Sequence, residues 1–325
     1  MTPRLLPALE PATYRRHALH GEARAWPETN CYVDLWIETL HGLGLDPVAG
    51  LAFCVAIDLE GDQWTFFKYP IADLERLYGF DVFELNVWRS LPDHVAEQVA
   101  LGRVVVVELD SFFLPDTAGT AYRAEHVKTS VAVELFDLPG RRMRYFHNAG
   151  YYELAGDDFA GAFRLDAPRG AHLPPYVEVA KRARPPLEGD ALAAAARALL
   201  RHHLARRPAE NPFVAFRARF ERDLAWLKEA ALADFHAYAF ATLRQFGAAF
   251  ELLATFARWL GERGARAIAD AATEFDTIAT TAKTMQFKLA RAVQGRRAVD
   301  FGPLLDELTS AWSRGQARLD AAVDR

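Results

Sequence analysis

Cys31 is the residue whose type and position best suit chemistry. It begins a stretch, residues 31–43, in which apolar side chains recur with the spacing of one helix face. Thr29 and Asn30, directly before it, are typical helix N-caps. A thiol at a helix N-terminus lies near the positive end of the helix dipole and near unpaired backbone N–H groups, which favour the thiolate and stabilise an oxyanion. The position therefore suits a nucleophile, and the alternative is a small buried hydrophobe, the usual fate of a free cysteine.

A cysteine nucleophile needs a base and a group that orients the base. His126 directly precedes a strand-like stretch, residues 127–136, and Asn148 follows the next such stretch, residues 142–146. Neighbouring strands that end close together would bring the two side chains into contact. The chain order Cys, His, Asn is that of papain-like enzymes, although any such trio can be ordered this way by chance. We therefore predict Cys31, His126 and Asn148 as the catalytic residues.

Several polar and aromatic residues are candidates for binding the substrate or supporting the base. Asp110 flanks an apolar-aromatic turn and would cap the loop, bind an acceptor amine or orient His126. His147 is an alternative third catalytic member or a second base. Aromatic side chains near the predicted site would line a pocket, with core packing as the alternative. We predict five substrate-binding residues: Asn30, Asp110, Tyr122, His147 and Trp64.

Common phosphate and metal motifs are missing from the sequence. It has no G-x-x-x-x-G-K-[ST], no G-x-G-x-x-G and no H-E-x-x-H. The only two cysteines, Cys31 and Cys54, are 23 positions apart, which argues against a thiolate zinc site. His202 and His203 are adjacent on an expected helix, so they point about 100° apart and cannot chelate as an i, i+4 pair would. We expect no metal site and no bound cofactor.

The elements that must position these residues change character near residues 185–189, PPLEG, where prolines and a glycine discourage regular structure. Before this point, short strand-like runs, at 51–59, 63–67 and 103–109, alternate with turns and a helix at 92–101. After it, phenylalanines recur at three- or four-residue steps, which is typical of a helical bundle core. We predict an α+β domain at residues 1–189 and an α-helical bundle at residues 190–325.

Charge and composition restrict the function classes. The net charge is −5 and the sequence pI is near 6.1, which argues against nucleic-acid binding. Residues 1–189 carry 18 Lys and Arg against 27 Asp and Glu, whereas residues 190–325 carry 20 against 16. No apolar run approaches the roughly 18 residues of a membrane span, and the first residues lack a signal-peptide pattern. With so few cysteines, we expect a cytoplasmic protein without membrane partners.

Several stretches carry a resemblance to an uncharacterised bacterial family of unknown function, over most of the chain. They are ETNCYVDLWIETLHGLGLDP, EGDQWTFFKYP, FELNVWR, ELDSFFLPDTAGTAYRAEHVKTSVAV and YFHNAGYYEL. More distantly, the layout resembles the papain-like acyltransferase family of butirosin biosynthesis protein H. There, a cysteine opens the first long helix, a strand ends in aspartate, two aromatics and Leu-Pro, and a histidine heads the next strand.

Cys31, Asp110 and His126 match that pattern, and Asn148 falls where the family has aspartate. The sequence departs from the family at residues 124–125, Ala-Glu, where the family has a glycine before the histidine, and at Asn30. The resemblance implies a papain-like α+β fold with a helical companion domain. It also implies that an acyl group moves from a phosphopantetheine thioester on an acyl carrier protein to the cysteine and then to an amine acceptor, as an acyl or aminoacyl transfer.

Two other functions remain open from the sequence. The same fold would suit a cysteine amidase or peptidase if water reached the acyl-enzyme. A helical lid over the cleft would exclude water and so favour transfer over hydrolysis. A non-catalytic module that binds a carrier protein is the second alternative. Because carrier proteins are typically acidic, a docking surface would use the basic side chains that follow residue 190, with a solvated helix face as the alternative. These are Arg201, Arg206, Arg207, Arg217 and Arg219.

Overall fold

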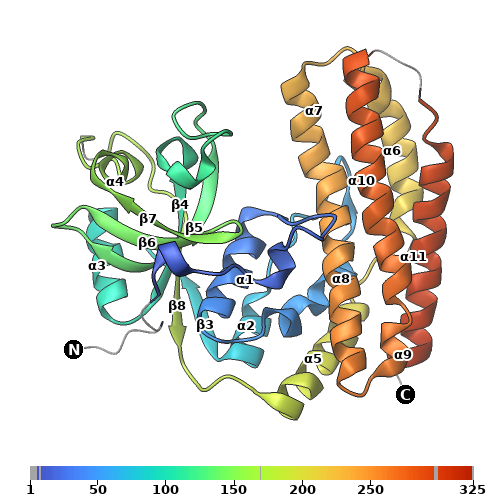
Figure 1. Cartoon of the computed structure of the whole chain (residues 1–325), viewed down its shortest axis with the longest axis horizontal. Coiled ribbons are helices and arrows are strands. Elements are labelled where there is room, and N and C mark those ends of the chain that lie inside the picture. The colour runs from blue at the N-terminus through green and yellow to red at the C-terminus, as the bar shows by residue number, and fades with distance from the viewer. Residues whose placement is uncertain (1–5, 7–8, 169, 296–298, 324–325) are drawn as a thin grey trace. The chain divides into compact units, whose positions relative to one another are not determined.

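The computed structural model describes residue 6 and residues 9–168, 170–295 and 299–323, which divide into two units. Unit 1 draws on Met1–Gly21, Asn30–Pro47 and Pro70–Leu187, and unit 2 on Glu22–Thr29, Val48–Tyr69 and Glu188–Arg325. Figure 1 shows the sheet of unit 1 and the long helices of unit 2. Two segments of the first 189 residues therefore pack with the C-terminal helices, so the units do not follow a single cut in the chain.

The sheet of unit 1 has six strands, all paired with antiparallel neighbours. In spatial order they are β3 (Phe80–Glu84), β8 (Val177–Arg182), β4 (Val104–Asp110), β5 (Lys128–Asp137), β6 (Arg142–His147) and β7 (Gly150–Ala155). Strand β4 is central, which agrees with its run of four valines, because a strand covered on both faces has no polar side. The hairpin between β5 and β6 turns where the Asp137 carboxylate accepts the backbone N–H of Gly140 at 3.0 Å.

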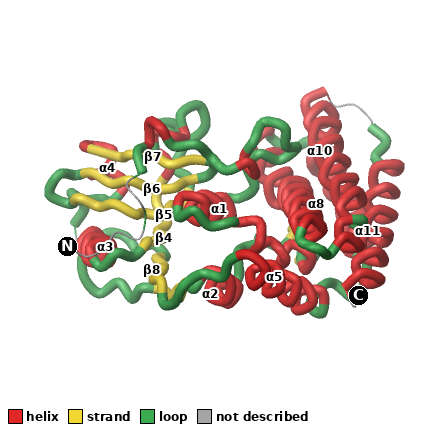
Figure 2. Tube along the Cα trace, turned by 60° about the horizontal axis from the view of Figure 1, so that its bottom comes forward, coloured by secondary structure: helices red, strands yellow, loops and turns green. Residues whose placement is uncertain are grey.

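Helices cover both faces of this sheet, and Figure 2 shows α1 (Cys31–Gly42) and α3 (Leu91–Ala100) on opposite sides of it. On one face, Val95 of α3 and Phe159 of α4 (Gly156–Ala162) pack against Tyr145. Residues alternate between faces along a strand, so the next residue, Phe146, faces the other way. The Phe146 ring packs closely on Gly42 of α1, so closely that a Cβ at Gly42 would lie only 2.8 Å from the ring. Helix α1 therefore covers the opposite face of the sheet. Helix α2 (Ile71–Tyr78) precedes β3.

Helix α1 is buried around most of its circumference and is held in part by a polar cluster. His20, which is fully buried, contacts Asp34 through Nε2 at 3.3 Å and Glu38 through Nδ1. Glu38 also accepts hydrogen bonds from the Tyr14 hydroxyl and from the backbone N–H of His17. Burial alone would lower the pKa of His20, but hydrogen bonds to Asp34 and Glu38 and their charges outweigh it and raise the pKa to about 9. The cluster therefore favours a protonated His20.

Unit 2 is built around phenylalanine-rich helices. Trp64 packs against Phe213 and Phe246 with ring centroids 4.9 Å apart in each case, and Phe250 and Phe275 continue the core. The helices are α5 (Gly189–Leu204), α6 (Pro212–Leu227), α7 (Leu232–Ala239), a π-helical segment (Phe240–Arg244), α8 (Gln245–Glu262), α9 (Arg266–Ala269), α10 (Ala272–Gly295) and α11 (Gly302–Val323). Among the described residues, no helix has the length and apolar character needed to cross a membrane.

One predicted strand is wrong, and a second is shorter than expected. Residues 51–59 were expected to be extended, but Pro47–Ala56 form a 3-10 helix, and the strand expected at 63–67 is only β2 (Gln63–Trp64), paired with β1 (Leu59–Glu60). A short, continuous apolar run has no period, so the sequence pattern cannot distinguish a buried strand from a buried helical turn. The mixed α+β class with a C-terminal helical region is confirmed.

Trp64 is also a correction to the predicted substrate site. Its side chain is 1% exposed and lies in the aromatic core of unit 2, where it fills space among phenylalanines. Its indole N–H has no hydrogen-bond partner among the described residues, so the contacts of Trp64 are those of its ring.

Replacing Trp64 tests this structural role. We expect Trp64→Ala to lower the free energy of unfolding by about 3–5 kcal/mol, because it leaves a large cavity. Trp64→Phe should cost less, because it keeps a ring and removes the unpaired donor. Urea unfolding followed by circular dichroism measures both. Trp88→Ala is the matched control, since Trp88 is 71% exposed and its loss should change stability by less than about 0.5 kcal/mol. A Trp64→Ala variant as stable as the wild type would contradict the assignment.

The His20 cluster predicts a pH dependence of stability. The folded pKa is raised from 6.5 to about 9, so the stabilisation is fully present below pH 6.5 and is lost as the pH rises through 9. The wild type should lose on the order of 2–3 kcal/mol between pH 6.5 and 9 relative to His20→Gln. Urea unfolding at both pH values measures the difference. Equal losses in the two proteins would show that His20 is neutral in the folded state.

Candidate active site

The end of β4 and the beginning of β5 bring His126 to Asp110. These strands are antiparallel neighbours, and Asp110, the last residue of β4, pairs in register with Lys128, the first residue of β5. His126 stands two residues before that pair, within reach of the Asp110 side chain. Its Nδ1 lies 2.6 Å from Oδ2 of Asp110, while Oδ1 of Asp110 accepts the backbone N–H of Phe112 at 3.1 Å. The carboxylate is therefore anchored to the backbone and oriented toward the imidazole.

The His126 ring is held in place while its second nitrogen stays accessible. It stacks on Phe112 with centroids 4.4 Å apart and planes 14° apart, and the edge of Phe113 lies near it. The His126 side chain is 68% exposed, and its Nε2 has no hydrogen-bond partner among the described residues. A carboxylate on Nδ1 favours the tautomer in which Nε2 has a free lone pair. This nitrogen can therefore accept a proton from a bound molecule.

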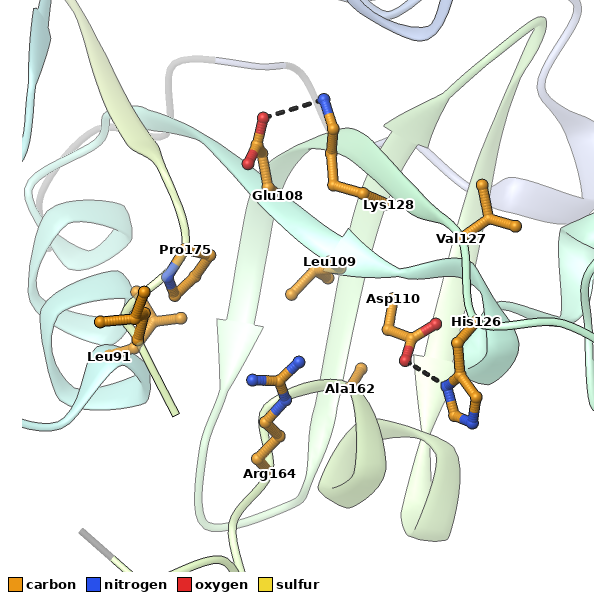
Figure 3. Close-up of a pocket in the computed structure, with 11 residues that line it drawn as sticks. Leu91, Glu108, Leu109, Asp110, His126, Val127, Lys128, Ala162, Arg164 and Pro175 are labelled. Atoms are coloured by element: carbon orange, nitrogen blue, oxygen red, sulfur yellow. Dashed lines mark hydrogen bonds and ion pairs between the residues drawn. The ribbon is translucent and has the colours of Figure 1, made fainter. Parts of the chain in front are cut away.

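His126 lines a pocket of about 360 Å³ at this end of the sheet. Figure 3 shows Asp110 and His126 on one side and Arg164 facing the same space, below Leu109. Glu108 and Lys128 form an ion pair of 3.0 Å at the margin. The remaining lining residues are Leu91, Val127, Ala162, Leu173 and Pro175. The pocket combines an apolar wall with a small number of charged groups, which is the usual composition of a small-molecule site.

His147 occupies a different environment from His126. Its Nδ1 contacts the Asp116 carboxylate, which also accepts the Tyr145 hydroxyl, and its Nε2 lies 2.7 Å from Oγ1 of Thr129. The order Thr129, His147, Asp116 resembles a nucleophile, base and orienter. However, the side chains of His147 and Asp116 are only 1% and 2% exposed. Because a substrate cannot reach these atoms, the group fastens the loop after β4 to the sheet.

Cys31 lies at the first position of α1, as predicted, and its side chain is partly exposed. Asn30 is the N-cap: its side chain accepts the backbone N–H of Val33 at 3.0 Å, and it is itself buried. No hydrogen bond joins the Cys31 thiol to His126 in the part of the chain that the structure describes, and Cys31 does not line the pocket of His126. Cys54 is fully buried, and burial raises the pKa of its thiol.

Asn148 forms the turn between β6 and β7 rather than contacting His126. Its φ is +45°, in the left-handed region that asparagine tolerates better than most residues. The side chain that contacts His126 is instead Asp110, which the sequence offered both as a substrate-binding residue and as an alternative orienting group. Tyr122 donates its hydroxyl to Asp158 at 2.9 Å. Of the predicted site residues, the structure brings His126 and Asp110 into contact, and no hydrogen bond or ion pair among the described residues joins the others to this pair.

Three charged pocket residues were not singled out from the sequence. Glu108 and Lys128 had a usable signal, because they lie at the ends of strands that were both predicted. Arg164 had none: it follows Phe163, the C-cap of the short helix α4, at a position where glycine is typical. Among the described residues, no group of three or more His, Cys, Asp or Glu side chains could hold a metal ion.

The sequence matches two family models that together span most of the chain. One describes the DUF1839 N-terminal domain and matches residues 15–182, and the other describes the DUF1839 C-terminal domain and matches residues 189–321. The chain belongs to the DUF1839 family. No curated protein matches it. The interval between the two matches, residues 183–188, contains the two prolines of the stretch at 185–189. The matches do not extend the resemblance to papain-like acyltransferases.

Three of the five basic residues considered for docking form ion pairs within unit 2 of this DUF1839 protein. Arg207 pairs with Asp320 at 2.7 Å, Arg219 with Asp223 at 2.8 Å, and Arg217 with Asp306. Docking of an acidic partner on this surface stays a prediction.

Substituting Asn148 separates a turn residue from a catalytic one. We expect Asn148→Gly to change the free energy of unfolding by less than about 1 kcal/mol, because glycine adopts positive φ readily. Asn148→Val should destabilise the protein by more than this, because a β-branched side chain is strained in that conformation. Urea unfolding measures both changes. Equal stability of the two variants would contradict the turn role.

Proposed function

We propose that this DUF1839 protein catalyses acyl transfer from a thioester to an amine, with His126 as the general base that Asp110 orients. The observation that supports this most is the 2.6 Å contact between Nδ1 of His126 and Oδ2 of Asp110, in an exposed side chain that lines a pocket. A positioned histidine is the commonest general base in enzymes and contributes about 10²–10⁴-fold to a rate.

The reaction follows from where the proton goes. The amine nitrogen attacks the thioester carbonyl carbon, and its proton passes to Nε2 of His126. Asp110 stabilises the imidazolium that forms, because its carboxylate lies on the other ring nitrogen. The C–S bond then breaks, and the departing sulfur takes the proton from Nε2. An amide and a thiol result, and His126 returns to its neutral form without any covalent bond to the protein.

A covalent route through Cys31 is the second candidate. It is favoured by the position of Cys31 at the first residue of a twelve-residue helix and by its partial exposure. In this route the thiolate attacks the thioester, the donor thiol leaves, and the amine then releases the acyl group from Cys31. Because Cys31 does not line the pocket of His126, direct transfer is the route that the geometry supports better.

The thioester donor in this proposal is the phosphopantetheine arm of an acyl carrier protein or a small thioester of the same chemistry. The support for the donor class is the resemblance at Cys31, Asp110 and His126 to papain-like acyltransferases. If water replaced the amine, the same base would make the protein a thioester hydrolase, and with an amide in place of the thioester it would act as an amidase or peptidase. Product analysis with and without an amine distinguishes the two outcomes.

The test is acyl transfer from butyryl-N-acetylcysteamine to a panel of amines, with the amide products measured by mass spectrometry. We expect His126→Gln to lower the rate by about 10²–10⁴-fold, because no other base is positioned there. Asp110→Asn should lower it by at least about tenfold, because the ring loses its orienting charge. His202→Gln, in an exposed helical histidine of unit 2, is the matched control and should leave the rate unchanged.

Cys31→Ser separates the two routes in the same assay. Direct transfer predicts an unchanged rate and no acyl adduct on Cys31 by intact-mass analysis. The covalent route predicts an adduct in the wild type and loss of activity in Cys31→Ser. A His126→Gln variant as active as the wild type would overturn the proposal as a whole.

A further inference from the structure

We infer that Arg164 is a binding residue for an oxyanion, so that the molecule held beside His126 carries a carboxylate or phosphate group. The inference rests on the proposed function for its reaction, but its central observation concerns Arg164 itself. This arginine lines the pocket of His126, is exposed to solvent, and directs its guanidinium into the pocket space in Figure 3.

The backbone at Arg164 has a conformation that usually selects glycine. Its φ is +51°, and it follows the C-terminal end of α4. The N–H of Leu165 bonds to the carbonyl of Ala160 at 2.9 Å, and the N–H of Arg164 bonds to that of Gly161 at 3.0 Å. This is the Schellman arrangement, in which the left-handed residue is most often glycine. Glycine would fit this backbone without strain, so what arginine adds here is its side chain, which places a positive charge at the end of α4 and a guanidinium at the pocket.

The charges around the pocket leave Arg164 without a counterion. Asp110 is paired with His126, and Glu108 is paired with Lys128. The Arg164 side chain has no ion pair or hydrogen bond among the described residues. Since the two acidic side chains that line the pocket are already paired, an anionic ligand is the natural partner for this guanidinium.

The chemistry of the two groups is complementary. A guanidinium presents parallel N–H donors that match the two oxygens of a carboxylate or phosphate. Arg164 would fix the anionic end of a ligand, while the His126 side chain lines another part of the same pocket. A volume of about 360 Å³ suits a small molecule rather than a long polymer. The substrate class is therefore a small amine or acyl thioester that carries an oxyanion.

Anion binding can be measured without catalysis. The probes are acetate, inorganic phosphate and neutral acetamide at constant ionic strength, and the readout is the NMR signal of the exposed His126 ring. We expect saturable shifts with at least one anion and none with acetamide. Acetate alone would indicate a carboxylate ligand, and phosphate alone a phosphate. If neither anion gave a saturable shift in the wild type, the inference would be wrong.

Arg164→Gly removes the guanidinium without straining the backbone, because glycine is preferred at this position, so the fold should be retained. It should weaken anion binding by at least tenfold. Arg164→Asn, which also tolerates positive φ, serves if the glycine variant is unstable. The matched control is Arg141→Gly, because Arg141 has a φ of +46° in the exposed turn between β5 and β6, outside the pocket. It should bind the anion like the wild type.

A substrate pair links this inference to the reaction and keeps the two proposals distinguishable. Arg164→Gly should raise KM for succinyl-N-acetylcysteamine, which ends in a carboxylate, relative to the neutral butyryl compound. Saturable anion binding by a wild-type protein that shows no transferase activity would refute the proposed function and leave the binding site intact. Equal anion affinity in Arg164→Gly and the wild type would overturn the inference.

Discussion

The register between β4 and β5 is the constraint on which the candidate site depends. Asp110 at the end of β4 and Lys128 at the beginning of β5 are paired residues. His126 lies in the loop between these strands, two residues before Lys128, and this places its ring beside the Asp110 carboxylate. A shift by one residue would turn Asp110 to the other face of the sheet and break the contact. Burial alternates only at the end of β4, where Leu109 is buried between the partly exposed Glu108 and Asp110, so a one-residue shift would expose Leu109 and bury the two carboxylates. Packing at this end of β4 thus sets the geometry of the polar pair.

Burial assigns different roles to histidines that look alike in the sequence. His20 lies between two carboxylates without access to solvent, and His147 is bonded at both ring nitrogens inside the sheet unit. Each of them fastens one segment of chain to another. His126 has one nitrogen bonded to Asp110 and the other accessible. Catalysis needs that combination, because a base must be oriented and must also reach the proton that it removes.

Local signals account for the parts of the fold that were predicted well. The helix at residues 31–43, the valine strand and the hairpin over 127–146 depend on periodicity and turn residues close together in the chain. The site was predicted only in part, because Asp110 and His126 stand at predicted strand ends, whereas the position of Cys31 depends on which face α1 covers. That helix is buried nearly all round, so its pattern of apolar residues does not indicate the face.

Long-range packing explains the other differences. Trp64 was expected in the substrate pocket, but segment 48–69 packs with helices more than a hundred residues later. Arg164 departs from the residue preference of its own turn, so the pattern that ends α4 could not reveal it. The neighbours of Trp64 are the helices of unit 2, and Arg164 shares its pocket with residues of β4 and of the loop before β5. Both sets are remote in sequence, so a local pattern cannot predict these neighbours.

The protonation of the His126 ring tests the central claim most directly. The claim is that Asp110 holds the proton on Nδ1 and leaves Nε2 free to accept another. Nitrogen-15 NMR of the protein, at a pH where the ring is neutral, distinguishes the two tautomers. We expect the Nδ1–H form in the wild type and a mixture of tautomers in Asp110→Ala. A wild-type ring protonated at Nε2 would contradict the account, because that nitrogen could not act as the base.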